Sequence, residues 1–392
     1  MPLARQRIFN LHGPTFPAGL FNFKNPSNQF TAWKKAVARV KGGTGRGRIV
    51  VCGDSTSWGE GGGTGGTNNR TGANQLCCPT MVGKTLNNLG ITCNWENFAS
   101  SGGNTGVVNI TDWTGSTATY KTGVVPGSSW ALSSSTSAGG CLFTDTTGTT
   151  AFAYTPEIAV DTFELFDIQV STGGAISYNV DGGSSTGLSQ TNATSQYRVT
   201  SIPAGSVGTH TLNVARTSGN AFICGMRAYN STIPAVDIIN LGRCSSQTSD
   251  WIVNANPWSP LPSFSQYCST ADLVIIDHTI NDAFNSQTIA NYKANLQTLV
   301  NTAKSGGADV LMMTGNPSNV ATISAGVQES FRLALCDVVV ANGLPLIDQE
   351  TKYISWVNLN QRGWMYNNNH PNQFGYADIG AFVGGALKSY ST

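Results

Sequence analysis

Short apolar runs alternate with amphipathic stretches in both the first and the last part of this chain of 392 residues. Helical periodicity is expected over 30–40 and 74–88, and strands over 49–52 and 91–98. From 235 onward, strands are expected over 235–241, 272–276, 309–313 and 344–347, and helices over about 247–255, 286–305, 322–342 and 373–389. Strands that alternate with helices predict an α/β fold, with a doubly wound parallel sheet flanked by helices.

The middle of the chain has a different pattern. Between about 107 and 233, helical periodicity gives way to short alternating runs separated by glycine-rich turns, the clearest at 163–170, 175–180, 197–202, 209–214 and 221–229. This pattern predicts an inserted antiparallel β-sandwich of jelly-roll type that interrupts the sheet. Such a module would carry its own core, so the α/β sheet need not depend on it. Aromatic residues of its strands, such as Trp130 and Tyr154, favour that core over a sugar-stacking face.

The predicted organisation therefore has four parts. They are an N-terminal arm and helix over 1–44, the first part of the α/β domain over 45–112, the inserted β-sandwich over 113–233, and the second part of the α/β domain over 234–392.

Composition limits the classes of partner. Charged residues make up 11% of the chain, the formal net charge is +1, and no long run of Lys or Arg is present. These features argue against nucleic acid or an anionic membrane and favour uncharged partners such as sugars or neutral esters. No signal peptide is visible and no apolar run approaches the ~18 residues needed to span a bilayer, so we expect a soluble protein without membrane insertion. The nine cysteines contain no C-x-x-C pair and indicate neither a zinc site nor a complete disulfide framework.

Ser55 is the first candidate for chemistry. It follows the apolar run 49–52 and Gly53, so it is expected in a tight turn at the carboxyl end of a strand, where α/β proteins place catalytic residues. A serine nucleophile needs a base, most often histidine. Of the four histidines, His370 stands in a turn-forming stretch before the last predicted helix and is expected to be the most accessible, whereas His278, at the end of an apolar strand, reads as a core or supporting residue.

Acyl transfer also requires hydrogen-bond donors for the developing oxyanion. Asn281 and Gly102 each follow a predicted strand. With Ser55 they would therefore gather at one cleft along the carboxyl edge of the sheet.

Four sequence blocks together resemble those of the SGNH, or GDSL-like, hydrolase superfamily. They are Gly53-Asp54-Ser55, the stretch from Asn97 through Gly102 to Asn104, Asn281-Asp282, and His370-Pro371-Asn372. The resemblance covers roughly 45–106 and 235–390 and implies that Ser55 is the nucleophile and His370 the general base. It also implies an oxyanion hole made by Gly102, Asn281 and the Ser55 N–H. The chemistry it implies is ester hydrolysis through an acyl-enzyme, with no metal and no cofactor.

The chain departs from the pattern of this superfamily in three places. Thr279 stands where G-x-N-D has its glycine. The stretch around Gly242 also resembles the glycine block, which makes Gly242 a rival to Gly102. Asn367 occupies the acid position of D-x-x-H; it can orient the imidazole but supplies no charge, so the acid is either missing or replaced by Asp348 or a backbone carbonyl.

The sequence thus indicates a serine esterase that removes O-acetyl groups from a polysaccharide. The alternatives are a small-ester or lipid esterase, or a non-catalytic glycan-binding protein that keeps the fold. The turn-rich composition is also similar to that of phage tail proteins and secreted glycan-active enzymes, which suggests a virion-associated or extracellular location. The natural ester and the oligomeric state stay open.

Overall fold

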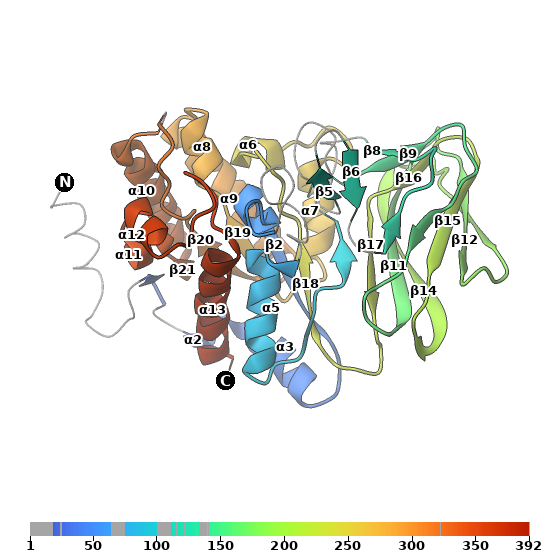
Figure 1. Cartoon of the computed structure of the whole chain (residues 1–392), viewed down its shortest axis with the longest axis horizontal. Coiled ribbons are helices and arrows are strands. Elements are labelled where there is room, and N and C mark those ends of the chain that lie inside the picture. Colours follow the sequence, from blue (N-terminus) through green and yellow to red (C-terminus); the bar gives the residue numbers. More distant parts are fainter. Residues whose placement is uncertain are drawn as a thin grey trace.

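A seven-stranded sheet forms the centre of the α/β part, on the left of Figure 1. The computed structural model describes residues 19–23, 26–63, 75–99, 111–114, 117–120, 123–132, 139, 141–321 and 323–391. In spatial order the strands are β1 (Leu20–Phe21), β21 (Leu346–Ile347), β20 (Asp309–Met313), β19 (Leu273–Asp277), β2 (Gly47–Gly53), β18 (Val236–Asn240) and β3 (Cys93–Asn94). All neighbours are parallel except β1, which pairs antiparallel with β21. The strand with Ser55 at its end therefore lies inside the sheet, between β18 and β19.

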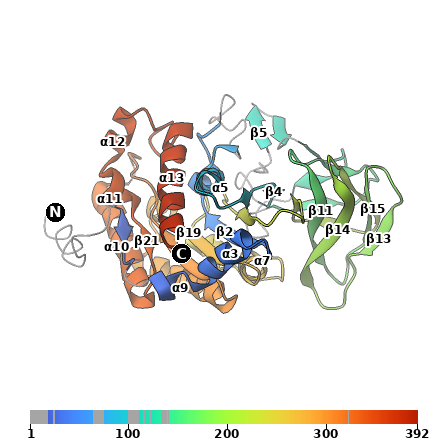
Figure 2. The same cartoon turned by 90° about the horizontal axis from the view of Figure 1, so that it is seen from below.

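Helices cover both faces of this sheet, as the alternation of strands and helices predicts. Ordered along the chain, the described helices are α2 (Pro26–Gln29), α3 (Thr31–Lys41), α4 (Ser55–Trp58), α5 (Cys78–Asn88), α6 (Thr248–Trp251), α7 (Pro260–Cys268), α8 (Ile280–Phe284), α9 (Ile289–Ser305), α10 (Ala325–Asn342), α11 (Gln349–Tyr353), α12 (Trp356–Gln361) and α13 (Gln373–Ser389). Seen from below, β2 and β19 lie between α5 and α13 on one side and α9 and α10 on the other (Figure 2). None of these helices is long and apolar enough to cross a bilayer.

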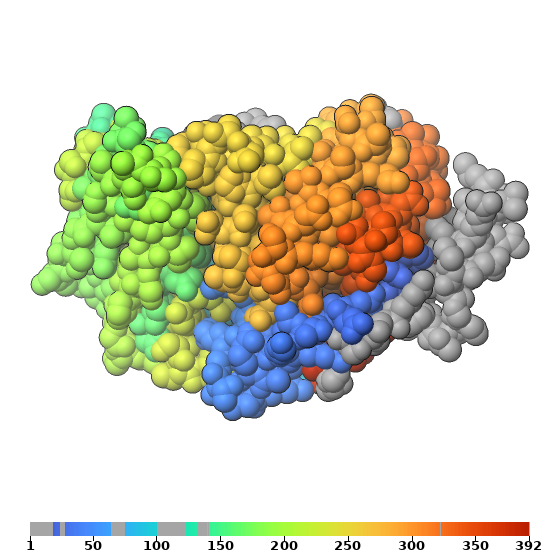
Figure 3. All heavy atoms as spheres, turned by 180° about the vertical axis from the view of Figure 1, so that it is seen from behind, coloured from blue at the N-terminus to red at the C-terminus, as the bar shows by residue number. Residues whose placement is uncertain are grey.

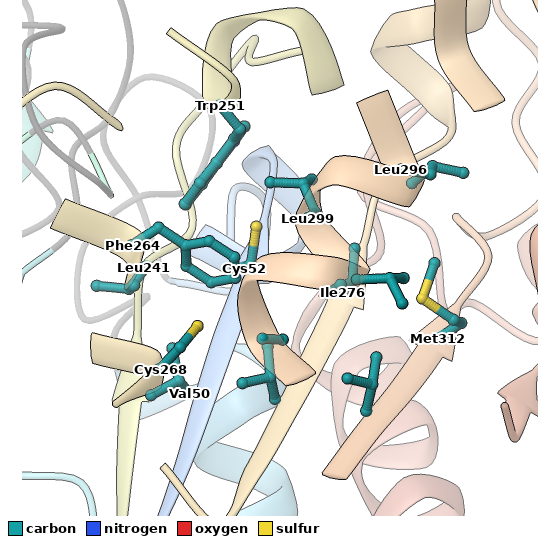
Figure 4. Close-up of a cluster of buried hydrophobic side chains, with 14 of the residues drawn as sticks. Val50, Cys52, Leu241, Trp251, Phe264, Cys268, Ile276, Leu296, Leu299 and Met312 are labelled. Carbon is teal, nitrogen blue, oxygen red and sulfur yellow. The ribbon is translucent and has the colours of Figure 1, made fainter. Parts of the chain in front are cut away.

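Two buried clusters fill the space between sheet and helices, because successive residues of a strand point to opposite faces. On one face Val50, Cys52 and Ile276 pack against side chains of α6, α7 and α9, such as Trp251 and Phe264 (Figure 4). On the other face the alternate strand residues, such as Val51 and Ile275, pack against α3, α5 and α13. Burial on both faces explains why these strands are continuous apolar runs in the sequence.

The middle of the chain forms antiparallel sheets, on the right of Figure 1. Their strands are β4 (Asn97–Phe98), β5 (Thr111–Thr114), β6 (Thr117–Tyr120), β7 (Val124–Val125), β8 (Ala131–Leu132), β9 (Phe143–Asp145), β10 (Phe152–Tyr154), β11 (Val160–Gln169), β12 (Ala175–Val180), β13 (Thr186–Ser189), β14 (Gln196–Gly208), β15 (Leu212–Ser218), β16 (Ala221–Ile223) and β17 (Gly225–Tyr229). A sheet in the order β13-β12-β15-β10-β7 and one in the order β14-β11-β17-β4 share a buried cluster. Trp130, Phe152 and Tyr154 belong to this core rather than to a surface platform.

The expected strand over 91–98 is the main error in the predicted elements. It is two short strands, of which β3 joins the parallel sheet beside β18 and β4 pairs with β17 of the antiparallel sheets. The chain therefore passes from one sheet to the other at Trp95 and Glu96, and β3 is not adjacent to β2. The sequence analysis also did not predict helices α7, α8, α11 and α12.

Buried charges join the two regions. Arg227 on β17 binds Glu164 on β11, at 2.5 Å, and Asp237 on β18. Arg46, directly before β2, binds the other oxygen of Asp237 at 2.6 Å. Burial raises the pKa of Asp237, but Arg227 and Arg46 outweigh it and hold that pKa below its usual value. From behind, the green surface of the antiparallel sheets adjoins the yellow α/β surface (Figure 3).

Candidate active site

Ser55 is the first residue of α4, and only Asp54 separates it from the end of the interior strand β2. Asp54 caps this short helix by accepting a hydrogen bond from the Thr56 N–H. Gly53 is required here because an added Cβ would lie 2.2 Å from the Ser57 Oγ, where the helix folds back over the strand end. The turn thus places Ser55 at the carboxyl edge of the sheet, with 5% of its surface exposed.

His370 meets Ser55 across 315 residues of sequence. Its Nε2 lies 2.8 Å from the Ser55 Oγ. The turn that carries His370 is closed by an isolated bridge between Met365 and Pro371 and continues into α13. Gly61 allows the loop after α4 to pack against this turn, since a Cβ at Gly61 would lie 2.6 Å from the Pro371 carbonyl oxygen. The structure therefore brings together the two residues that the sequence analysis paired.

Asn367 contacts His370 through both ends of its amide. Its Oδ1 accepts hydrogen bonds from the backbone N–H groups of Asn369, at 2.8 Å, and His370, at 2.7 Å. Its Nδ2 lies 3.2 Å from the His370 Nδ1. Two backbone donors fix the oxygen, so the NH₂ group faces the ring, where Nδ1 can only accept. In a neutral imidazole this leaves the hydrogen on Nε2, toward Ser55, which is the tautomer opposite to that of a general base.

Asp348, the alternative acid, is bound to other groups. It caps α11 and accepts hydrogen bonds from Arg332, at 2.6 Å, and from the Thr351 hydroxyl, at 2.6 Å. The expectation that it replaces the acid beside His370 finds no support in these contacts.

Of the residues expected around the oxyanion besides Ser55, the structure describes Asn281 and Gly242. Asn281, in the first turn of α8, donates from its side chain to the Ser246 carbonyl oxygen at 3.1 Å. Gly242 packs closely on α4, because an added Cβ would lie 2.4 Å from the Trp58 nitrogen. The Gly242 N–H donates to the Asn240 Oδ1 at 2.8 Å, so it is not directed toward a substrate. Gly102 lies outside the described residues.

Ser245 was not singled out by the sequence analysis. Strands β18 and β2 run in parallel, with Asn240 opposite Val51, and the Arg243 N–H donates to the Gly53 oxygen at 2.9 Å. Ser55 lies two residues beyond Gly53, and two residues beyond Arg243 the chain reaches Ser245. It is exposed and has φ +61°, which is uncommon for a residue other than glycine. Within the described part of the chain its N–H donates to no other group; no sequence signal distinguishes such a serine from an ordinary loop residue.

Two buried carboxyl groups lie behind the nucleophile turn. The Asp54 Oδ1 accepts from the Thr56 hydroxyl at 2.8 Å, and the Asp277 Oδ2 accepts from the Ser57 hydroxyl at 2.7 Å and the Thr56 hydroxyl at 3.3 Å. Burial raises the pKa of Asp54 to about 6, against the hydrogen bonds from Thr56. Burial, and then the charge of Asp54, raise the pKa of Asp277 well above its usual value. Both carboxyl groups therefore favour their neutral form more than an exposed aspartate does.

His278 is a core residue. It is fully buried between Cys52, whose Sγ lies 3.6 Å from its Nε2, and the ring of Trp251. Burial lowers the pKa of His278 to about 3, so the ring stays neutral.

The chain matches no protein-family model and no curated protein, but it resembles solved structures. A peptidoglycan O-acetylesterase is 16% identical and has a TM-score of 0.68 over 94% of this chain and 98% of its own. The chain therefore shares the fold of this O-acetylesterase. A lipase/acylhydrolase from Enterococcus faecalis is 21% identical over 40% of this chain and 77% of its own, with a TM-score of 0.33. A family two carbohydrate esterase from Cellvibrio japonicus is 9% identical over 69% of this chain and 96% of its own, with a TM-score of 0.30.

Proposed function

We propose that this SGNH-type protein is a serine esterase that removes O-acetyl groups from a polysaccharide. The observation that carries the proposal is the 2.8 Å contact between the Ser55 Oγ and the His370 Nε2 at the carboxyl edge of the sheet. The Ser55 oxygen attacks the ester carbonyl carbon while its proton passes to Nε2, and the same proton then leaves with the sugar hydroxyl. Water repeats the two steps on the acyl-enzyme and releases acetate.

The oxyanion is proposed to bind to three groups around Ser55. The Ser55 N–H is at the start of α4, where backbone N–H groups lack partners within the helix. The Asn281 side-chain NH₂ group donates one N–H to the Ser246 carbonyl oxygen and has a second N–H that can donate to the oxyanion. Ser245, two residues beyond the contact of Arg243 with Gly53, has a backbone N–H that donates to no other described residue, which favours it over Gly242. Gly102 stays a candidate from the sequence alone.

Asn367 is proposed to hold the His370 turn but to support catalysis weakly. Its oxygen binds two backbone N–H groups, and its NH₂ group faces the Nδ1 that should carry a hydrogen when Nε2 accepts the serine proton. Turnover is therefore expected to be slow. The same observation favours a second candidate, a glycan-binding protein of this fold without catalysis.

The substrate class is argued from charge and likeness of fold. A net charge of +1 and few charged residues suit an uncharged polymer. The similar peptidoglycan O-acetylesterase, which covers nearly the whole chain, supports an acetylated glycan over a lipid or small ester. We also propose that residues 113–233 form an inserted β-sandwich that presents this polymer, supported by the core shared between the two antiparallel sheets.

Acetate release from a panel of acetylated polysaccharides tests the proposal. The wild type should release acetate from at least one of them, while Ser55→Ala and His370→Ala each lose nearly all of it, because nucleophile and base act as a unit. Activity retained by Ser55→Ala would contradict the assignment of the nucleophile. Binding to a glycan without acetate release would select the second candidate.

A further inference from the structure

A cavity of about 620 Å³ lies between α5 and the antiparallel sheets. Its wall combines Asn87 at the last turn of α5, Trp95 between β3 and β4, and Ile158 before β11. Figures 1 and 2 both show α5 on the side of the α/β part that faces β11. The volume is within the range of sites that hold small ligands, roughly 300–1,000 Å³.

The aromatic wall of this cavity is fixed by hydrogen bonds. The Trp95 indole Nε1 donates to the Gln75 Oε1 at 3.1 Å, and the Gln75 Nε2 donates to Glu157 at 2.8 Å. Gln75 is held in turn by Lys84, which donates to its carbonyl oxygen at 2.7 Å. On one face the Trp95 ring packs against α5, since a Cβ at Gly83 would lie 2.9 Å from it. The ring is therefore preorganised as one wall of the cavity.

Apolar and amide groups complete the cavity. Ile158 and Ile233 line it and are 42% and 48% exposed. The side chains of Asn87 and Asn230 line it as well, and each uses its oxygen on a backbone N–H. Within the described part of the chain, their NH₂ groups donate to no other residue and are thus available to a ligand.

Arg46 lines this cavity, but its guanidinium group is already bound and is not available to an anionic ligand. Arg46 donates from Nε and Nη2 to Asp237, and from Nη1 to the carbonyl oxygens of Asn230 and Ile233. The cavity thus offers an indole ring, aliphatic side chains, amide donors and the carboxylates of Glu96 and Glu157 as acceptors, without a spare positive charge. Such a cavity suits an uncharged sugar. The indole ring can pack against the C–H face of the sugar, and the amides can hydrogen-bond to its hydroxyl groups.

We infer that this cavity is a second glycan-binding site, which takes an uncharged oligosaccharide segment of the polymer. The inference rests on the proposed function for the class of ligand. Arg46 precedes β2 and Ser55 follows it, and the seven residues of the strand, at ~3.3 Å each, separate the two by roughly 23 Å. Binding here would hold the polymer while a different segment is deacetylated at Ser55, and so raise the local concentration of acetyl groups.

Calorimetric titration with cellohexaose and with chitohexaose tests this site. The parent is Ser55→Ala, in which turnover is absent. Ala159→Trp places a large ring in the cavity from an exposed lining position, and Trp95→Ala removes the aromatic wall. Ala193→Trp introduces the same ring at an exposed position in the connection between β13 and β14, which does not line the cavity.

The parent and Ala193→Trp should bind at least one hexasaccharide equally well, and Ala159→Trp and Trp95→Ala should bind it at least tenfold more weakly. The inference is overturned if neither sugar binds, or if Ala159→Trp binds as tightly as the parent. In the wild-type background, Ala159→Trp should hydrolyse 4-nitrophenyl acetate at the unaltered rate. If the wild type does not hydrolyse this ester, the proposed esterase function is contradicted. The titrations would then still decide whether the cavity binds a glycan.

Discussion

At the scale of single residues, Asn367 differs by one atom from the acid that D-x-x-H would supply. An aspartate there could keep both backbone hydrogen bonds on one oxygen and accept the His370 Nδ1–H with the other. Asn367→Asp should therefore favour the competent tautomer and stabilise the imidazolium of the transition state. A charge-assisted bond stronger by ~1.4 kcal/mol gives about tenfold in kcat.

The measurement is a pH-rate profile on one acetyl ester. Asn367→Asp should be faster than wild type, with the acidic limb of its profile moved to higher pH, because the carboxylate favours the protonated ring. Asn368→Asp is the matched control: it adds the same charge next door, on an exposed residue, and should leave the rate nearly unchanged. A slower Asn367→Asp would mean that His370 is already oriented by a different group.

A second residue-scale prediction concerns the carboxyl groups of Asp54 and Asp277. Their pKa values are raised in the folded state. Above pH 3.8 these two groups therefore hold more protons in the folded protein than in the unfolded chain. The free energy of unfolding should therefore fall as the pH rises through about 6. Asp277→Asn cannot ionise, and urea unfolding between pH 5 and 8 should show a smaller fall for this variant than for wild type. Equal falls would mean that Asp277 is already ionised when folded.

At the scale of elements, the sequence predicted the parallel sheet and its long helices because burial on both faces of a strand leaves a continuous apolar run. Ser55 and His370 could be paired from the sequence because each stands in a block with a recognisable turn pattern. Short elements such as α8 and α12 could not be predicted, since tertiary packing rather than periodicity supports so few residues. The position of Ser245 and the raised pKa of Asp277 depend on a neighbouring strand, which the local sequence does not reveal.

Gly242 provides a test of how closely β18 and α4 pack. In Gly242→Ala, the added Cβ would meet the Trp58 nitrogen at 2.4 Å, so α4 must shift and move Ser55 away from His370. We expect at least a hundredfold loss of ester hydrolysis, because small displacements of a reacting group cost about that much. Gly343→Ala, at a helix end with open space around it, controls for the loss of a glycine and should affect stability only. A Gly242→Ala variant with full activity would show that the contact does not position Ser55.

At the scale of the whole molecule, the antiparallel sheets are less separable than the sequence suggested. The sequence favoured a module with its own core, but Phe166 and Tyr197 belong to the same buried cluster as Tyr267 of the α/β part. Alternating strands reveal a sheet but not which of its faces meets another domain. Removal of 113–233 would expose that cluster, so we now expect the deletion to destabilise the α/β part.

Arg227→Leu tests this coupling without deletion. It leaves Asp237 and Glu164 buried with fewer partners, which should cost about 3–5 kcal/mol of unfolding free energy. Lys293→Leu breaks an exposed pair with Asp337 and should cost at most ~1 kcal/mol. Both are measured by urea unfolding. A loss for Arg227→Leu as small as that for Lys293→Leu would mean that the two regions are joined by apolar contacts alone.

The proposal that His370 activates Ser55 is tested most directly by the mass of the protein after reaction with a fluorophosphonate probe. The serine oxygen displaces fluoride from phosphorus only if a neighbouring base takes its proton, so the reaction reports on Ser55 and His370 without knowledge of the natural ester. We expect one adduct per chain, located on Ser55 by peptide mapping, absent in Ser55→Ala and much slower to form in His370→Ala. An unlabelled wild type, or an adduct on a different serine, would contradict the pairing of Ser55 with His370.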